Sequence, residues 1–318
     1  MIPFVFMGTP EFSVIILDHM EEAGYMPSLV VTQPDRPCGR GQRLTQSPVA
    51  CWASQRGIRV MKPDHCRKPE WVEEISALAP ELIITAAYGQ ILPTSLLAIP
   101  VKGCLNIHAS LLPLYRGASP IQAALLAGDR ETGITLMLMD EGIDTGPILA
   151  QSRMELSDEI NAGELNLELA KLGGELIVAN LQLYLDGGLA SQPQEQAHAS
   201  ITHLIKKADG MVDFGGNARA VHNHIRAMNP WPGAFAFLEG KRYKLNRAKV
   251  FDGEIPSRDV PGELLILGKK MVVSCGEGAI ELLEIQPQSG SCLFCEECSH
   301  NFVSGSVFDS CPVPNVKQ

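Results

Sequence analysis

The chain has 318 residues, of which 45% are hydrophobic and 19% charged, so it is long enough for two globular domains with a sizeable core. No apolar run reaches membrane-spanning length and no basic leader precedes the first strand, so we expect a cytoplasmic protein with no membrane partner and with nine free cysteines. The formal net charge of −10 argues, for the chain as a whole, against a nucleic-acid partner.

The first thirty residues predict the opening of a parallel α/β sheet. Ile2–Met7 is an apolar run that ends at Gly8, which indicates a buried strand followed by a turn. A helix follows from Pro10, and Leu29–Thr32 reads as a second strand. The turn lacks the glycine spacing of a dinucleotide site, so a dinucleotide cofactor is not supported.

Residues 33–48 form a segment rich in proline and glycine with few large apolar side chains. We expect a loop with no structure of its own, which at this length is either functional or mobile. It carries Arg36, Arg40 and Arg43 against a single acid, which suits the binding of phosphate groups. The alternative is an ordinary solvated surface loop.

A polar pair follows a buried strand later in this half of the chain. Leu82–Ala86 and Cys104–Ile107 are apolar runs that predict buried strands. Asn106 and His108 are two residues apart, so they point to the same side near a strand end, where open α/β sheets bind ligands. Such a pair suits polarising a carbonyl group or moving a proton. The alternative is a pair that merely ties down the loop.

A second polar loop follows the strand predicted at Thr132–Leu138. Residues 139–147 read Met-Asp-Glu-Gly-Ile-Asp-Thr-Gly-Pro, and the glycines permit a tight backbone. Asp144 is placed to orient or ionise a histidine, or to relay a proton through water. The alternative is an Asx-turn residue with no chemical role.

The domain boundary is predicted from a change in composition. Leucines at helical spacing from Ala162 to Leu183 indicate a core helix. Residues 186–200 are small, polar and punctuated by proline and glycine, which is typical of a linker. We therefore expect a first domain at residues 1–186, a linker at 187–204 and a second domain at 205–318.

The second domain reads as a small all-β barrel after one helix at 217–228. Short strands are predicted at 234–238, 243–250, 262–267, 270–275 and 279–285. Residues 1–203 hold 13 Lys and Arg against 23 Asp and Glu, whereas residues 204–318 hold 13 of each. The acidity therefore belongs to the first domain, and the second keeps a basic run from Lys241 to Lys249, usually a solvated strand face.

Four motifs together resemble the signature of the 10-formyltetrahydrofolate-dependent formyltransferases. They are Asn106-x-His108, Ser110-Leu-Leu-Pro113, Arg116-Gly117 and Asp144-Thr-Gly146. Asn229-Pro-Trp-Pro-Gly-Ala and the strands after it are similar to the second domain of the methionyl-tRNA formyltransferases. The resemblance implies a Rossmann-like open, mostly parallel sheet followed by a small all-β OB-like barrel. One departure is Leu114, where the family often carries Arg.

The resemblance also implies an activity, which is formyl transfer from 10-formyltetrahydrofolate to the α-amine of methionyl initiator tRNA for translation initiation. It assigns catalysis to Asn106, His108 and Asp144. It also implies that no metal takes part and that the protein is a monomer. The folate-binding residues that it implies are Ser110, Leu111, Leu112, Pro113, Tyr88 and Gly89. The tRNA-binding residues that it implies are Arg40, Arg43, Lys206 and Lys207. For Tyr88, core packing is the alternative.

A cysteine cluster near the end departs from the family. Cys292, Cys295 and Cys298 precede His300, and such a set can hold zinc or an iron–sulfur cluster. The compressed spacing favours thiols that bind nothing. Two other functions stay open at this point. One is a folate-dependent hydrolase or a sugar-nucleotide formyltransferase with the same three residues, and the other is a non-catalytic RNA-binding protein.

Overall fold

The computed structural model describes residues 2–38, 41–255 and 260–309. The chain divides into two compact units. The first unit comprises Met1–Pro120, Glu131–Glu155 and Asn166–Thr202, and the second comprises Ile121–Arg130, Leu156–Leu165 and His203–Gln318. Most of the segment predicted as a linker, up to Thr202, therefore folds with the first unit. In the described ranges, no helix has the length and apolar character needed to span a membrane.

The first unit is built on a seven-stranded sheet with the order β10-β9-β7-β6-β1-β2-β5. From β7 to β5 the neighbouring strands are parallel, and β9 and β10 add to the β7 edge in antiparallel pairs. This confirms the predicted Rossmann-like, mostly parallel sheet. The strands are β1 Phe4–Gly8, β2 Leu29–Val31, β5 Val60–Met61, β6 Leu82–Ala86, β7 Cys104–His108, β9 Glu131–Leu138 and β10 Ile148–Glu155.

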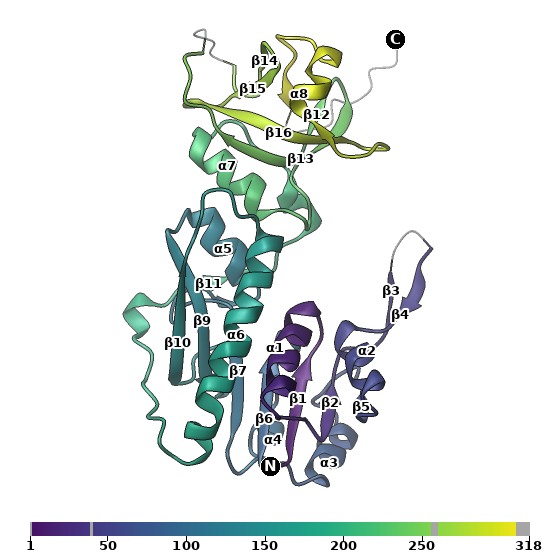
Figure 1. Cartoon of the computed structure of the whole chain (residues 1–318), viewed down its shortest axis with the longest axis vertical. Helices are drawn as coiled ribbons and strands as arrows, with labels where there is room; N and C mark the ends of the chain where they lie inside the picture. The colour runs from purple at the N-terminus through teal and green to yellow at the C-terminus, as the bar shows by residue number, and fades with distance from the viewer. Residues whose placement is uncertain (1, 39–40, 256–259, 310–318) are drawn as a thin grey trace. The chain divides into compact units, whose positions relative to one another are not determined.

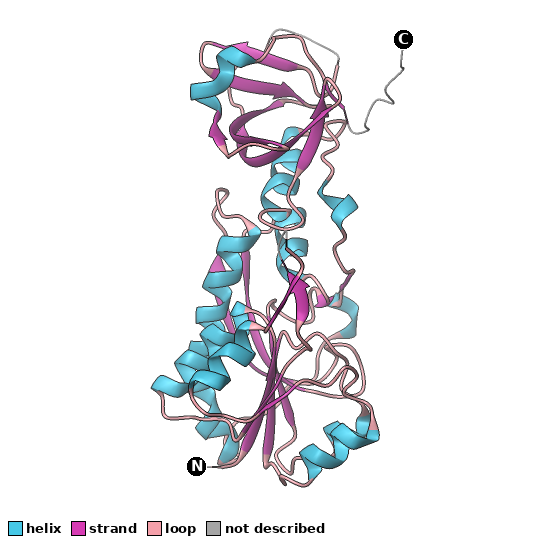
Figure 2. Ribbon diagram, turned by 90° about the vertical axis from the view of Figure 1, so that its right-hand side faces the viewer, coloured by secondary structure: helices cyan, strands magenta, loops and turns pink. Residues whose placement is uncertain are grey.

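Helices cover both faces of this sheet (Figure 2). The long helix α6 approaches closely because Gly173 has no side chain, and a Cβ there would lie 3.0 Å from the Ile107 methyl group of β7. Ser47 caps α2 by accepting a bond from Ala50 N at 3.0 Å, just before the Pro48 that begins the helix. The first unit holds α1 Glu11–Glu22, α2 Pro48–Gln55, α3 Pro69–Ser76, α4 Thr94–Leu97 and most of α6 Ala162–Leu185, whereas α5 Pro120–Ala127 lies almost wholly in the second unit (Figure 1).

The arginine-rich segment at residues 33–48 has structure of its own, so the prediction of an unstructured loop was wrong. Strands β3 (Arg36–Cys38) and β4 (Arg43–Thr45) form an antiparallel hairpin in which Arg36 pairs with Thr45. Arg40 lies outside the described residues. In the sequence, the Gly-Arg-Gly motif between two short segments was the available hairpin signal, but the proline- and glycine-rich composition concealed it.

A two-stranded parallel ladder joins two distant loops of the first unit. Strand β8 (Arg116–Gly117) pairs with β11 (Ile201–Thr202). Further along the same segment, Gln192 forms an antiparallel bridge with Ile148 at the start of β10. Residues 192–202, called the strap below, thus run along the sheet edge that carries the polar loops.

The second unit is built on an antiparallel sheet with the order β14-β15-β16-β13-β12-β18, and β17 adds to β16. Helix α7 (Ala218–Ala227), capped by Asn217, packs on β13. This curled sheet confirms the predicted small all-β, OB-like domain. The strands are β12 Phe235–Leu238, β13 Lys241–Val250, β14 Leu264–Leu267, β15 Lys270–Ser274, β16 Ala279–Pro287, β17 Leu293–Phe294 and β18 Phe308–Asp309.

One buried histidine of α7 makes the second unit sensitive to acid. His222 is 4% exposed, and its Nδ1 has no hydrogen-bond partner. Burial, together with the cations Arg226 and Arg219, lowers the pKa of His222 from 6.5 to about 4. The unfolded chain therefore binds a proton between about pH 6.5 and pH 4 that the folded chain does not bind, and this favours unfolding.

We expect the free energy of unfolding to fall by roughly 3 kcal/mol on account of His222 as the pH drops from 6.5 to about 4. His222→Gln should remove this part of the acid sensitivity, because the amide does not titrate. Urea denaturation of both proteins at pH 7 and pH 4.5 measures the difference. Equal losses of stability in the two proteins would contradict the assignment.

Candidate active site

Three polar side chains from two strand ends of the first unit meet. Asn106 and His108 lie on β7, and Asp144 lies in the loop between β9 and β10. Asn106 Nδ2 donates to Asp144 Oδ1 at 3.2 Å, and His108 Nδ1 lies 3.5 Å from Asp144 Oδ2. The prediction that Asn106 and His108 share one side of their strand is confirmed, since both reach the same carboxylate.

The orientation of the Asn106 amide follows from its two neighbours. The hydroxyl group of Thr85, on β6, lies 2.8 Å from Asn106 Oδ1 and donates to it. On the other side, the Asp144 carboxylate can only accept, so the amide nitrogen must face it. One N–H of that nitrogen is then used, and the second is left for another acceptor. The Thr85 contribution was not anticipated from the sequence, because Thr85 sits within an apolar strand.

His108 is held between two acceptors. Its Nε2 lies 3.0 Å from the Tyr115 carbonyl oxygen, and its Nδ1 faces Asp144. The ring is 6% exposed, so its orientation is set by packing as well as by these contacts. The 3.5 Å gap to Asp144 exceeds the usual N–H···O distance, and such contacts often tighten only when substrate binds.

The backbone near this site is unusual at each of three strand ends. Ala87 after β6, Tyr115 after β7 and Asp144 after β9 have φ values of 46°, 60° and 51°. Left-handed backbone is uncommon for residues other than glycine, and such residues cluster at functional sites. Asp144 is kept in place by Gly117 N, which donates to its Oδ2 at 2.8 Å.

The Ser110–Pro113 segment is fastened to the sheet by its own polar groups. The Ser110 hydroxyl donates to the Leu114 carbonyl at 2.6 Å. Thr135 of β9 donates to the Ser110 carbonyl at 2.7 Å and accepts from Leu112 N at 3.0 Å. Ser110 and Leu112 are buried. This segment is therefore fixed against β9, and the Ser110 hydroxyl is already bonded within the protein.

The loop at Tyr88 and Gly89 is likewise bonded internally. The ring of Tyr88 is 4% exposed and lies in the core cluster beside Cys66 and Leu92. Its carbonyl oxygen accepts from the Thr9 hydroxyl at 2.9 Å and from Gln33 Nε2 at 3.2 Å. Packing thus accounts for the ring, and any contact of this loop with a ligand falls to other backbone groups, such as those of Gly89.

Sequence comparison identifies relatives of the chain. The formyl transferase family matches residues 2–181, and the C-terminal domain of formyl transferases matches residues 204–298. The methionyl-tRNA formyltransferase of Geobacter sulfurreducens is 46% identical over 283 residues, which are 89% of this chain and 88% of that protein. The one of Carboxydothermus hydrogenoformans is 44% identical, over 90% of this chain and 92% of that protein. The chain belongs to the methionyl-tRNA formyltransferase family.

Solved structures share the fold of the family. An N-formyltransferase from Helicobacter canadensis, in complex with folinic acid and dTDP-3-aminofucose, matches 90% of this chain and all of its own, with a TM-score of 0.66 and 19% identity. A methionyl-tRNA formyltransferase from Clostridium thermocellum matches 81% of this chain and 97% of its own, with a TM-score of 0.56 and 18% identity. The resemblance drawn from the sequence motifs is confirmed.

The residues expected to bind tRNA are far in sequence from Asn106, His108 and Asp144. Arg43 is exposed on β4, and Arg40 lies outside the described residues. Lys206 and Lys207 belong to the second unit, where Lys207 begins the 3₁₀ turn Lys207–Gly210. Both lysines are exposed. Their role stays a prediction.

The cysteine cluster lies at the short helix α8 (Cys295–Cys298) of the second unit. Burial raises the pKa of the Cys295 and Cys298 thiols, so both favour the neutral form. Cys292 is exposed and lies 3.0 Å from Asn246 Nδ2. Over residues 2–38, 41–255 and 260–309, no group of three His, Cys, Asp or Glu side chains is arranged to hold a metal ion.

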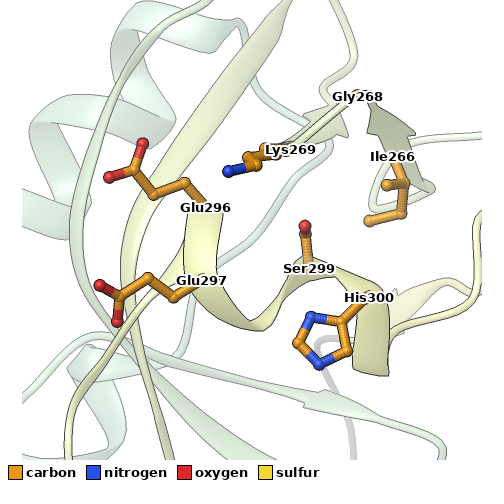
Figure 3. Close-up of a pocket in the computed structure, with 7 residues that line it drawn as sticks. All are labelled: Ile266, Gly268, Lys269, Glu296, Glu297, Ser299 and His300. Atoms are coloured by element: carbon orange, nitrogen blue, oxygen red, sulfur yellow. The ribbon is translucent and has the colours of Figure 1, made fainter.

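A shallow hollow of about 530 Å³ lies beside this helix (Figure 3). Its lining mixes both charges: Glu296 lies on α8, and the His300 ring comes from the 3₁₀ turn Ser299–Asn301 that follows α8. The lining residues are Ile266, Gly268, Lys269, Glu296, Glu297, Ser299 and His300. The hollow belongs to the second unit and none of the three polar side chains of the first unit lines it.

Proposed function

We propose that this chain transfers the formyl group of 10-formyltetrahydrofolate to the α-amine of methionyl initiator tRNA. The observation that carries the proposal is the convergence of Asn106 and His108 on Asp144, in a chain that has both domains of the family. We further propose that it acts as a monomer in the cytoplasm, where translation initiates.

The reaction exchanges one C–N bond for another. The amine nitrogen of methionine attacks the formyl carbon, the bond from that carbon to N10 of the folate breaks, and N10 takes up a proton. Negative charge develops on the formyl oxygen in the tetrahedral intermediate, and fixed N–H donors stabilise it. The N–H of Asn106 that is not bonded to Asp144 is one such donor. His108 becomes the other when the formyl oxygen replaces the Tyr115 carbonyl as the acceptor of its Nε2 proton.

Asp144 has two roles in this proposal. Its carboxylate orients Asn106 and His108 together, because each of its oxygens faces one of them. The attacking amine must be uncharged, so a proton has to leave it before or during the attack. Asp144 accepts that proton through a water molecule, since its side chain is partly exposed. No covalent enzyme intermediate is needed.

The decisive experiment compares acceptors with the full chain. Purified protein is given 10-formyltetrahydrofolate and, in parallel, charged initiator tRNA, free methionine or an amino sugar nucleotide. Formylation of the charged tRNA alone is the expected result. Formylation of the sugar nucleotide would show that the proposed acceptor is wrong and that the proposed formyl transfer is right. Release of formate without transfer would make the protein a hydrolase, and binding of tRNA without turnover would make it an RNA-binding protein.

The β3–β4 hairpin should contribute to tRNA binding. We expect Arg43→Ala to raise the KM for charged tRNA by about 10-fold, because a cation that contacts phosphate is lost. The KM for the folate donor should stay within about twofold. Arg153→Ala is the matched control, since Arg153 is an exposed arginine of β10 that pairs with Glu131. Equal KM values for Arg43→Ala and the control would contradict this role.

A further inference from the structure

A buried arginine of β8 donates hydrogen bonds to the side-chain amides of two glutamines. Arg116 is 4% exposed. Its Nε and Nη2 donate to Gln194 Oε1 at 3.0 and 2.7 Å, and its Nη1 donates to Gln196 Oε1 at 2.9 Å. Both glutamines belong to the strap, residues 192–202. A buried guanidinium requires such acceptors, so it orders the side chain of Gln194.

The opposite end of the Gln194 amide holds the loop that carries Asp144. Gln194 Nε2 donates to the Asp144 carbonyl at 2.9 Å and to the Gly146 carbonyl at 2.7 Å. Because a guanidinium can only donate, Arg116 forces Oε1 of Gln194 toward itself and Nε2 toward the loop. Gln194 is 8% exposed, and its bonds to Arg116 and to the Gly146 carbonyl are shielded from water.

The bonds from Gln194 hold the backbone at Asp144 in an uncommon conformation. Asp144 has a φ of 51°, a conformation that most residues avoid. Its carboxylate reaches Asn106, His108 and Gly117 N at once only while its backbone stays in place. Gln194 bonds the carbonyls of Asp144 and of the second residue after it, and so fixes the turn on both sides.

We propose that Gln194 is a positioning residue for Asp144, and that the strap thereby completes the active site. This inference rests on the proposed function, in which Asp144 organises Asn106 and His108. Gln194 is therefore the strap residue to which the proposal gives a role at the site, through its bonds to the Asp144 loop. Arg116 fixes the orientation of Gln194, because its N–H groups bind the Oε1 end of the Gln194 amide.

The test is Gln194→Glu in the full chain. The glutamate keeps two acceptor oxygens for Arg116, in a charge-assisted form, so the bonds from Arg116 and the fold are retained. It loses the N–H groups that hold the Asp144 and Gly146 carbonyls. Gln196→Glu is the matched control, because it makes the same charge change beside the same arginine and Gln196 does not bond the Asp144 loop.

We expect Gln194→Glu to lower kcat by about 100-fold, with both KM values within about threefold, as a small displacement of a catalytic group does. Gln196→Glu should stay within about twofold of the unmodified protein. An unchanged kcat in Gln194→Glu, or an equal loss in the control, would overturn the proposal. If Gln194→Glu does not fold, Gln194→Met is compared with Gln196→Met, since both remove an acceptor from Arg116 and only the first also removes the bonds to the Asp144 loop.

A second readout does not depend on turnover. The ring ¹⁵N resonances of His108 report the contact of Nδ1 with Asp144. They should shift in Gln194→Glu and stay in place in Gln196→Glu. Unshifted resonances in Gln194→Glu would overturn the positioning role, whatever acceptor the enzyme uses. If the unmodified protein does not formylate charged tRNA, the proposed function fails while this readout still decides the role of Gln194.

Discussion

Asp144→Asn is expected to lower kcat by about 1,000-fold, a loss within the usual range for removing a proton-transfer group. Asp144 Oδ1 accepts from Asn106 Nδ2 and its Oδ2 accepts from Gly117 N. An asparagine must present its NH₂ group to one of these donors, so one contact becomes repulsive. The negative charge that faces His108 is also lost. Steady-state formylation of charged initiator tRNA measures the effect.

A matched control lies four residues earlier in the same loop. Asp140 Oδ1 accepts from Gly142 N at 3.0 Å and from the Thr145 hydroxyl at 2.6 Å. Asp140→Asn keeps that oxygen as an acceptor, so the loop should hold its shape and kcat should stay within about threefold. A comparable loss of kcat in both variants would mean that turnover depends on the negative charge of the loop and not on the specific contacts of Asp144. Near-normal turnover in Asp144→Asn would refute the catalytic assignment.

Gly146→Ala should damage the site through the backbone. A Cβ at this position would lie 1.9 Å from the carbonyl oxygen of Leu138 and 3.2 Å from Asp140 N, so backbone atoms must move. The displaced turn carries Asp144, and we expect kcat to fall at least about 100-fold. Overpacking of this kind should also lower the free energy of unfolding by about 1–3 kcal/mol. Activity assays and urea denaturation measure the two effects separately.

The control for Gly146→Ala is a glycine with room for a side chain. At Gly216 the added Cβ would meet only the Cβ of Ala220, at 3.8 Å, which is ordinary contact. Gly216→Ala should therefore leave turnover unchanged and alter stability by less than about 1 kcal/mol. Full turnover in Gly146→Ala would mean that the backbone at Leu138 moves aside while Asp144 keeps its position. That result would contradict the expectation that the turn is rigid.

The secondary structure was largely predictable because its signals are local. Leu82–Ala86 occurs with the predicted bounds, since an apolar run is a signal that acts over a few residues. The hairpin of β3 and β4 was missed because its strands are three residues long and exposed, so burial left no pattern in their sequence. The fold class followed from the alternation of strands and helices and from the later run of short strands.

The three polar residues of the site could also be predicted. Asn106 and His108 lie at the end of one apolar strand and Asp144 follows another, and such strand ends meet at one edge of the sheet. The supporting residues could not be predicted. Gln194 lies 50 residues from Asp144 in a segment with the composition of a linker, and Thr85 is one polar residue inside a buried strand.

The amino-acid sequence by itself determined most element types, the fold class and which polar side chains stand at the strand ends, because these depend on residue type and short spacing. Only the tertiary structure decided where each polar group points. The Tyr88 ring turned into the core, while the Gln194 amide turned toward Asp144. The physical reason is that burial and hydrogen-bond pairing are set by partners far away in the chain, and these become neighbours only on folding.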